Sequence, residues 1–217
     1  LGKMEEKQIA KDDVQGIGLG VPGPVGADGT VHKCVNLGWG VINVEQILSG
    51  KTGLLVKAGN DANVAALGEM WQGGGKGHED VVMVTLGTGV GGGIIIGGKM
   101  ISGFHGAGGE IGHMTVVPEG GELCYCGRRG CFDTVCRSTI LDQYTDGNLE
   151  QFFELLEAGD KGAARLWDQY LDDLSLGIHN IRVLFDSVII LGGYVGAYIK
   201  NYMDELCRRV DERDSFD

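Results

Sequence analysis

The stretch HMTVVPEGGELCYCGRRGC constrains the fold more than any other part of the sequence, because its side chains can converge on one metal ion. Cys124, Cys126 and Cys131 are spaced C-x-C-x4-C, and His113 precedes the first of them by eleven positions. Three cysteines and one histidine are a donor set typical of closed, tetrahedral zinc sites. We therefore predict a structural Zn²⁺ bound by these four residues. The alternative is a group of reduced cysteines without a metal.

The other cysteines, Cys34, Cys136 and Cys207, are scattered and are predicted to be structural. Six cysteines in this arrangement do not form the pattern of a secreted, disulfide-bonded domain. The charged first residues lack the apolar core of a signal peptide, and no apolar run approaches the roughly 18 residues of a membrane helix. We expect a cytoplasmic protein that contacts no membrane.

Length and charge limit the class of protein further. A chain of 217 residues, 43% of them hydrophobic, can bury a core as one large domain or as two small lobes. The net charge of −12 makes nucleic acid a poor partner for this segment.

Strands and helices alternate along the chain, which indicates an α/β fold. Buried strands are predicted at 14–22, 81–89 and 187–193, and a shorter strand at 54–59. The segment after 89 is expected to return as the second strand of a hairpin. One helix is predicted to start at the N-cap Asn43 and to stop at Gly50 or Gly53, and a second is predicted at 60–71. Most of 149–210 is also predicted to be helical.

The glycine-rich stretch LGTGVGGG follows the strongest strand and matches G-x-G-x-x-G at Gly87, Gly89 and Gly92. A dinucleotide-binding turn of this type must open a helix, but the residues that follow have a β pattern. A tight hairpin fits better, with backbone N–H groups lining a phosphate and Thr88 offering a hydroxyl. A hairpin without a ligand fits the local pattern equally well.

The stretch NDANVAALGE is a second candidate site. Asn60 or Asp61 can cap the helix that follows, and a cap is all that the pattern requires. A carboxylate at a helix N-terminus is also stabilised in its charged form by the free N–H groups there. If Asp61 lies in a cleft, it can accept a proton from an alcohol.

Five motifs occur in order along the chain: GVPGPV, NDANVAALGE, TLGTGVGGG, GGEIGHM and CYCGRRGC. Together they resemble the repressor–open-reading-frame–kinase (ROK) family of sugar kinases and sugar-responsive regulators, and within it the bacterial glucokinases. The resemblance extends from about Gly16 to Cys131 and rests mainly on VIILGG beyond that. It implies an actin-like, ribonuclease-H-like α/β fold, in which two lobes bring a sugar and ATP together. It also implies a homodimer.

The resemblance gives the sugar side of the site its roles. Asp61 matches the catalytic base, which takes the proton from the 6-hydroxyl of the sugar. Asn60, Glu110 and His113 match residues that hydrogen-bond sugar hydroxyls, so that His113 would contact both the metal and the sugar. Asp133 stands where the family usually has a sugar-contacting glutamate, and its side chain is one methylene shorter.

On the nucleotide side, Gly87, Thr88 and Gly89 match the hairpin that holds the phosphates of ATP, which would enter with Mg²⁺. Gly192 and Gly193 match the adenosine loop, but LGGYVGAY replaces the commoner glycine-rich form of that loop, and Tyr194 is expected to crowd the base. The family's first phosphate motif, D-x-G-x-T, is absent. We therefore expect the N-terminal part of the first lobe to be missing, with 1–59 as its remainder and 60–217 as the C-terminal lobe.

Two functions follow from the resemblance. The first is an ATP-dependent hexose kinase, with glucose as the expected substrate, although the chain as it stands is expected to bind ATP poorly. The second is the sugar-sensing domain of a ROK transcriptional repressor, which would need a basic DNA-binding segment upstream.

Overall fold

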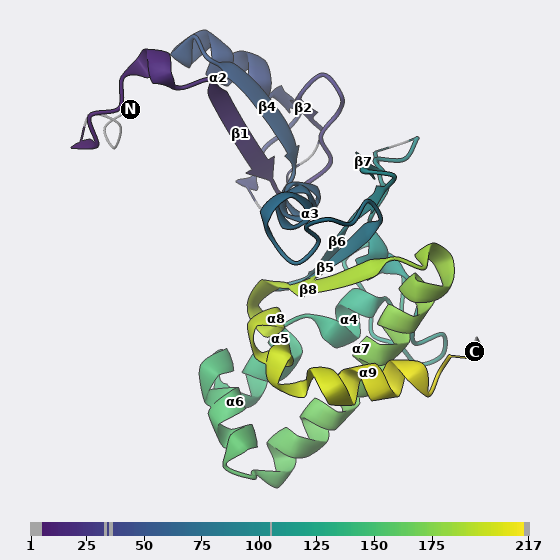
Figure 1. The fold of residues 1–217 in the computed structure, drawn as a ribbon. Coiled ribbons are helices and arrows are strands. Elements are labelled where there is room, and N and C mark those ends of the chain that lie inside the picture. The colour runs from purple at the N-terminus through teal and green to yellow at the C-terminus, as the bar shows by residue number, and fades with distance from the viewer. Residues whose placement is uncertain (1–5, 33, 35–36, 105, 215–217) are drawn as a thin grey trace.

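The computed structural model describes residues 6–32, 34, 37–104 and 106–214 (Figure 1). Its strands are β1 (Gly16–Val21), β2 (Thr30–Val31), β3 (Ile42–Asn43), β4 (Leu55–Asn60), β5 (Val81–Leu86), β6 (Val90–Ile96), β7 (Lys99–Met100) and β8 (Val188–Gly192). Its α-helices are α2 (Val44–Thr52), α3 (Asp61–Gln72), α4 (Phe132–Cys136), α5 (Thr139–Asp142), α6 (Leu149–Glu157), α7 (Lys161–Phe185), α8 (Gly193–Ile199) and α9 (Met203–Asp211). Short 3₁₀ segments are η1 (Lys11–Asp13), η3 (Ile111–His113), η4 (Gln143–Thr145) and η5 (Lys200–Tyr202). None of the described helices is long and apolar enough to span a membrane.

The strands form separate sheets, and the larger one lies in the middle of the molecule between α3 and the C-terminal helices (Figure 1). Near the N-terminus, β1 pairs with β4 in parallel, and β2 pairs with β3 antiparallel beside them. The larger sheet has the order β7-β6-β5-β8, with β5 and β6 antiparallel and β5 and β8 parallel. The predicted hairpin is therefore confirmed, with Gly87–Gly89 as its turn.

Helix α2 begins at the N-cap that the sequence predicted and ends at the second of the two predicted stops. The side chain of Asn43 accepts a hydrogen bond from the backbone N–H of Gln46 at 2.8 Å, which satisfies a donor of the first turn. The helix continues through Gly50 and ends at Gly53, which has φ of 69°.

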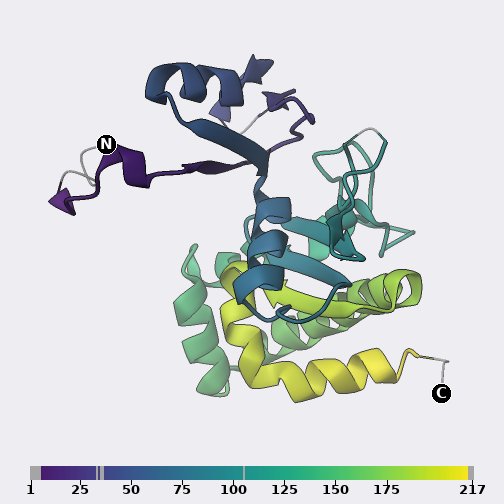
Figure 2. The same ribbon diagram turned by 45° about the horizontal axis from the view of Figure 1, so that its top comes forward.

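Helix α3 lies between the two sheets (Figure 1, Figure 2). It begins directly after β4, since Asn60 is both the last residue of the strand and the N-cap of the helix. Along its length it packs on the larger sheet, where Ala66 is buried against Val81, Met83 and Ile95. One helix thus fixes the position of the first sheet relative to the second.

Glycines in β6 allow this helix to approach the sheet closely. A β-carbon at Gly93 would lie 2.6 Å from Cβ of Ala66 and 3.0 Å from the carbonyl oxygen of Ala62, which is closer than real side chains come. A β-carbon at Gly91 would lie 3.3 Å from Cβ of Ala62. The glycine-rich sequence after the turn therefore serves helix packing, a role that the sequence did not reveal.

The opposite face of the larger sheet is covered by α4, α7 and α8, and the main core lies there. Val82, Val84 and Leu86 of β5 point to this side, whereas Val81 and Met83 point to α3, as the alternation of a strand requires. Phe132 and Leu174 are among the side chains without exposed surface in this core.

Three predictions about burial and strand ends were wrong in detail. Strand β1 is not buried: its residues alternate between exposed and half-buried up to Val21. Strand β8 is half-buried throughout, because it is an edge strand that pairs only with β5 among the described residues. The strand predicted at 81–89 ends at Leu86, where the turn Gly87–Gly89 begins.

The contact of α3 with β6 predicts opposite effects for two glycine substitutions. Gly93→Ala places a methyl group against Ala66 and should lower the free energy of unfolding by about 1–3 kcal/mol. Gly68→Ala, on the open side of the same helix where no atom lies within 4 Å, should raise it by up to about 1 kcal/mol through helix propensity. Urea unfolding measures both; equal effects would contradict the close contact.

Candidate functional site

A cavity of about 560 Å³ lies between the first sheet, the start of α3 and the segment after β7. The sheet side contributes Gly59 and the loop 24–27 that follows β1. Helix α3 contributes Asn63 next to its N-cap Asn60, and the other wall is the segment 100–106 without residue 105. The cavity therefore opens at the carboxyl ends of two parallel strands, where ligands commonly bind in α/β proteins.

Both the oxygen and the nitrogen of the Asn60 side-chain amide form hydrogen bonds. Its Oδ1 accepts a hydrogen bond from the backbone N–H of Asn63 at 3.2 Å, and its Nδ2 donates to the carbonyl oxygen of Gly23 at 3.3 Å. The amide thus joins the start of α3 to the loop after β1. A side chain fixed in this way lines the cavity in one orientation.

Asp61 is the first residue of α3, and its carboxylate is exposed. Oδ1 accepts a hydrogen bond from the backbone N–H of Ala62 at 2.9 Å. The N-terminus of a helix stabilises a negative charge at this position. The next residue, Ala62, lies beside β6, since a β-carbon at Gly91 would be 3.3 Å from Cβ of Ala62. Asp61 itself is not among the residues that line the 560 Å³ cavity, whereas Asn60 and Asn63 are.

The structure brings together the four predicted metal ligands. One ligand atom from each of His113, Cys124, Cys126 and Cys131 can be chosen so that all four lie within 4.8 Å of one another. The Sγ atom of Cys124 lies 3.6 Å from Nδ1 of His113, and the Sγ atoms of Cys126 and Cys131 are also 3.6 Å apart.

These separations fit a tetrahedral ion. With metal–sulfur bonds of about 2.3 Å and a metal–nitrogen bond of about 2.0 Å, two sulfurs are about 3.8 Å apart and a sulfur and a nitrogen about 3.5 Å apart. Three thiols and one imidazole are also the donors that zinc prefers. The arrangement has four protein ligands and therefore resembles a structural rather than a catalytic centre.

The thiols of this cluster differ in protonation. Burial raises the pKa of Cys131 to about 12, whereas the backbone hydrogen bond from Arg128 lowers the pKa of Cys126 to about 7. Burial also raises the pKa of Cys124. Because metal ligands bind as thiolates, a metal that enters this cluster displaces protons, so its apparent affinity rises with pH.

His113 connects this cluster to Glu110. While Nδ1 faces Cys124, Nε2 lies 3.9 Å from Oε2 of Glu110, whose side chain is half exposed. The carbonyl oxygen of His113 also accepts a hydrogen bond from Nη2 of Arg128 at 2.8 Å. The ring is therefore held between the cysteines and a carboxylate that points to solvent.

The glycines predicted to bind a nucleotide lie together at one edge of the larger sheet. The turn Gly87–Gly89 follows β5, and Gly193 follows β8, which runs parallel to β5. A β-carbon at Gly193 would lie 2.6 Å from the carbonyl oxygen of Leu86, so the two segments touch. Thr88 is exposed at the tip of the turn.

Tyr194 lies beside the same turn. Its ring is 65% exposed, and its Cδ2 atom would lie 4.0 Å from a β-carbon at Gly87. No loop separates β8 from α8, since Gly192 is both the last residue of the strand and the N-cap of the helix.

Asp133 lies next to the turn Gly87–Gly89, on the side of helix α4, and does not line the cavity. Its side chain is 2% exposed, and Oδ1 accepts a hydrogen bond from the backbone N–H of Val90 at 2.8 Å. It is not among the residues that line the 560 Å³ cavity with Asn60. The other cysteines also differ from one another: Cys34 and Cys136 are buried, whereas Cys207 is exposed on α9.

Sequence reasoning missed several residues of the site. Asn63 lines the cavity, and its Oδ1 atom is buried without a hydrogen-bond partner. Its position in NDANV, one helical turn after Asn60, was the signal that could have identified it. Ser138, which donates its backbone N–H to the carbonyl oxygen of Gly87 at 2.6 Å, left no such signal, because the two residues are far apart in sequence.

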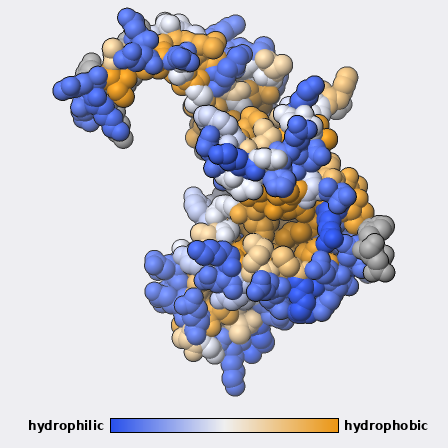
Figure 3. Space-filling model, viewed as in Figure 1, coloured by the Kyte–Doolittle hydropathy of each residue, from blue (hydrophilic) through white to orange (hydrophobic). Residues whose placement is uncertain are grey.

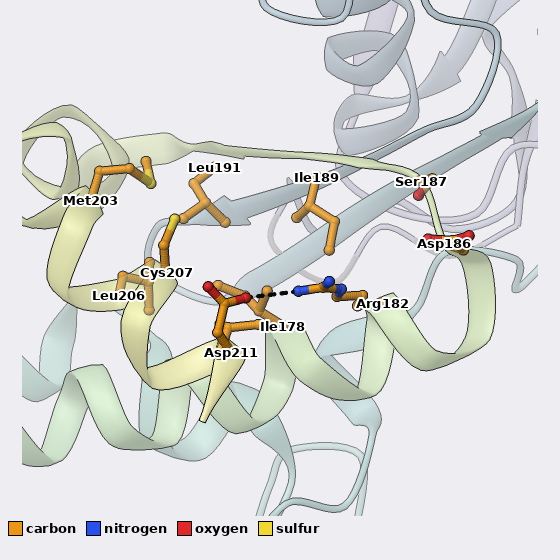
Figure 4. Close-up of a pocket in the computed structure, with 11 residues that line it drawn as sticks. Ile178, Arg182, Asp186, Ser187, Ile189, Leu191, Met203, Leu206, Cys207 and Asp211 are labelled. Carbon is orange, nitrogen blue, oxygen red and sulfur yellow. Dashed lines mark hydrogen bonds and ion pairs between the residues drawn. The ribbon is translucent and has the colours of Figure 1, made fainter. Parts of the chain in front are cut away.

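A second cavity, of about 350 Å³, lies between β8, α7 and α9 and contains none of the predicted site residues (Figure 4). Ile189 and Leu191 of β8 face Leu206 of α9 across it, and an ion pair between Arg182 and Asp211 lies at its edge. Apolar surface gathers along β8 in this region (Figure 3). The cavity is a groove beside an edge strand, away from the polar residues described above.

Comparison with known proteins identifies the fold class and the family. A glucokinase from Halalkalibacterium halodurans is 50% identical over 208 residues, which cover 86% of this chain and 63% of the glucokinase. The crystal structure of a ROK family glucokinase from Streptomyces griseus, in complex with glucose and AMPPNP, matches with a TM-score of 0.77 and 30% identity, covering 96% of this chain and 78% of that one. The chain thus has the actin-like, ribonuclease-H-like fold of the sugar kinases that the resemblance implied.

The model of the ROK family matches residues 2–213, and the chain belongs to this family. A ROK family transcriptional regulator, a homologue of the E. coli MLC protein, also matches, with a TM-score of 0.84 and 26% identity over 97% of this chain and 57% of that one. The chain spans about 63% of the length of the H. halodurans glucokinase. Kinases and regulators therefore share the described fold.

Proposed function

We propose that this protein transfers a phosphoryl group from ATP to the 6-hydroxyl of a hexose, with glucose as the first substrate to test. The observation that carries the proposal is the position of Asp61 at the start of α3: it follows Asn60, which lines the cavity, and precedes Ala62, which lies beside Gly91 of the strand after the glycine turn. The 50% identity to a glucokinase and the match to a glucokinase structure with glucose and AMPPNP support it.

In this mechanism each side chain has a defined task on the sugar. The carboxylate of Asp61 accepts the proton of the 6-hydroxyl as its oxygen attacks the γ-phosphorus. The fixed amide of Asn60 orients the sugar through a neighbouring hydroxyl. Glu110 and His113 bind hydroxyls at the anomeric end, and Asp133 was predicted from the family to help them.

The nucleotide enters as MgATP at the edge of the larger sheet. Backbone N–H groups of Thr88 and Gly89 bind its phosphates, and Gly192 and Gly193 lie beside the adenosine. The N–H of Gly87, which was also predicted to bind a phosphate, donates to the carbonyl oxygen of Gly89 at 3.0 Å and so closes the turn. The exposed ring of Tyr194 limits the space for the base on that side.

We further propose that His113, Cys124, Cys126 and Cys131 bind one structural zinc ion. Zinc supplies no chemistry to the transfer in this arrangement, since all four of its ligands are protein side chains. Its effect would be on His113: with Nδ1 as the metal ligand, the ring would carry its N–H at Nε2, beside Glu110, where it could donate to a sugar hydroxyl. The protein is further proposed to be a cytoplasmic homodimer, by analogy with the family.

A second function has support of its own. The match to a ROK transcriptional regulator has a TM-score of 0.84, and a putative xylose repressor from Caldicellulosiruptor is 30% identical over 92% of this chain. In that case the described residues bind the sugar, and DNA is bound elsewhere in the complete protein. Sugar-sensitive DNA binding by the complete protein, without sugar-dependent ADP release, would favour this function over the kinase.

In the complete protein, Asp61→Asn is expected to lower kcat for glucose-dependent ADP release about 10²–10⁴-fold, because the base is lost while the hydrogen-bonding side chain remains. Glucose binding, measured by calorimetry, should change little. The matched control is Asp204→Asn, which alters an exposed carboxylate in the first turn of α9 and should leave kcat unchanged. Normal turnover in Asp61→Asn would exclude Asp61 as the base.

Elemental analysis should find about one zinc per chain, as expected for one closed four-ligand site. Cys126→Ser should lower both the zinc content and the affinity for glucose, because His113 loses its anchor. Cys207→Ser removes an exposed thiol outside the cluster and should affect neither quantity. Full glucose affinity in a zinc-free variant would disprove the link between metal and sugar.

A further inference from the structure

The carboxylate of Asp133 lies against the turn between β5 and β6 and is hydrogen-bonded to it. It is 2% exposed, and its Oδ1 accepts the backbone N–H of Val90 at 2.8 Å. Val90 is the first residue of β6 and is itself 8% exposed. Without the carboxylate, this N–H would be left without that acceptor in a buried place.

The same oxygen also touches the tip of the turn. A β-carbon at Gly89 would lie 2.8 Å from Oδ1 of Asp133, closer than a real side-chain carbon comes. The carboxylate of Asp133 therefore fills the space next to Gly89 that a side chain would occupy. It lies close to the turn at Gly89 and is hydrogen-bonded to it at Val90.

The other end of the turn is held by the same short segment of chain. The carbonyl oxygen of Gly87 accepts a hydrogen bond from the backbone N–H of Ser138 at 2.6 Å. Helix α4 and the residues just after it thus contact the turn at Gly87 and at Val90. Cys131, the N-cap of α4, belongs to the Cys3His cluster, so the segment has an anchor at its far end.

We propose that Asp133 is a positioning residue for the nucleotide phosphates and not a sugar-binding residue. It holds Gly87–Gly89 in the shape that presents its backbone N–H groups to ATP. The proposal rests on the proposed kinase function and departs from the role that the family resemblance gave to this position. Its support is the use of Oδ1 by Val90, the burial of the side chain and the closeness of Oδ1 to the turn at Gly89.

The test compares Asp133→Ala with Asp133→Asn, which keeps an acceptor at the same place. Asp133→Ala should increase amide hydrogen exchange at Val90 about tenfold or more, because a hydrogen bond to a charged group is lost, and Asp133→Asn should change it far less. Calorimetry with AMPPNP should show affinity lowered about tenfold in Asp133→Ala, for the same reason, and largely retained in Asp133→Asn. Glucose affinity should stay within about twofold in both, since no hydrogen bond to the sugar is lost.

Two further variants complete the experiment. Gly89→Ala pushes a methyl group against Asp133 and should weaken AMPPNP binding even if Asp133→Ala does not fold. Asp204→Ala, an exposed carboxylate on α9, is the control and should change nothing. Weakened glucose binding with normal AMPPNP binding in Asp133→Asn would overturn the proposal, as would unchanged exchange at Val90 in Asp133→Ala. If the unaltered complete protein binds neither ligand, the kinase function fails, and exchange at Val90 still decides whether Asp133 holds the turn.

Discussion

The contact between α3 and the glycines of β6 is the constraint on which the rest of the structure depends. Helix α3 joins the two sheets, and its backbone can lie against β6 only because Gly91 and Gly93 have no side chains. On the other face of the same strand, a β-carbon at Gly92 would lie 2.5 Å from the side chain of Ile111. The strand β6 therefore determines how close to the sheet two elements lie: on one face the helix that starts with Asp61, and on the other the segment that leads to His113.

This packing explains how groups from distant parts of the sequence can act together. The N-terminus of α3 carries a carboxylate, the segment around Ile111 carries Glu110 and His113, and the turn before β6 offers backbone N–H groups. None of these groups needs to contact another to be correctly spaced. Each is positioned by β6, a strand in the interior of its sheet, and rigid elements of this kind hold functional groups more precisely than loops do.

The parts of the fold that were predictable from sequence are those determined by neighbours in the chain. The cap at Asn43, the start of α3 at Asn60 and the hairpin around Gly87–Gly89 depend on residues a few positions apart, as does the spacing of the cysteines. The exposure of β1 and β8 depends instead on which strands lie beside them. The hydrogen bond of Asp133 to Val90 spans 43 positions, and no local pattern announces it.

Helix α4 has a thermodynamic consequence that follows from its two ends. Its N-cap, Cys131, is a residue of the Cys3His cluster, and its Asp133 is hydrogen-bonded to Val90, next to the turn proposed to bind phosphates. If order in α4 favours both a bound metal and a bound nucleotide, the two events are linked, and linkage between binding equilibria is reciprocal. If the bound metal raises the affinity for the nucleotide by some factor, the bound nucleotide must raise the affinity for the metal by the same factor. A metal bound to the cluster would then stabilise the conformation of the protein that binds the nucleotide.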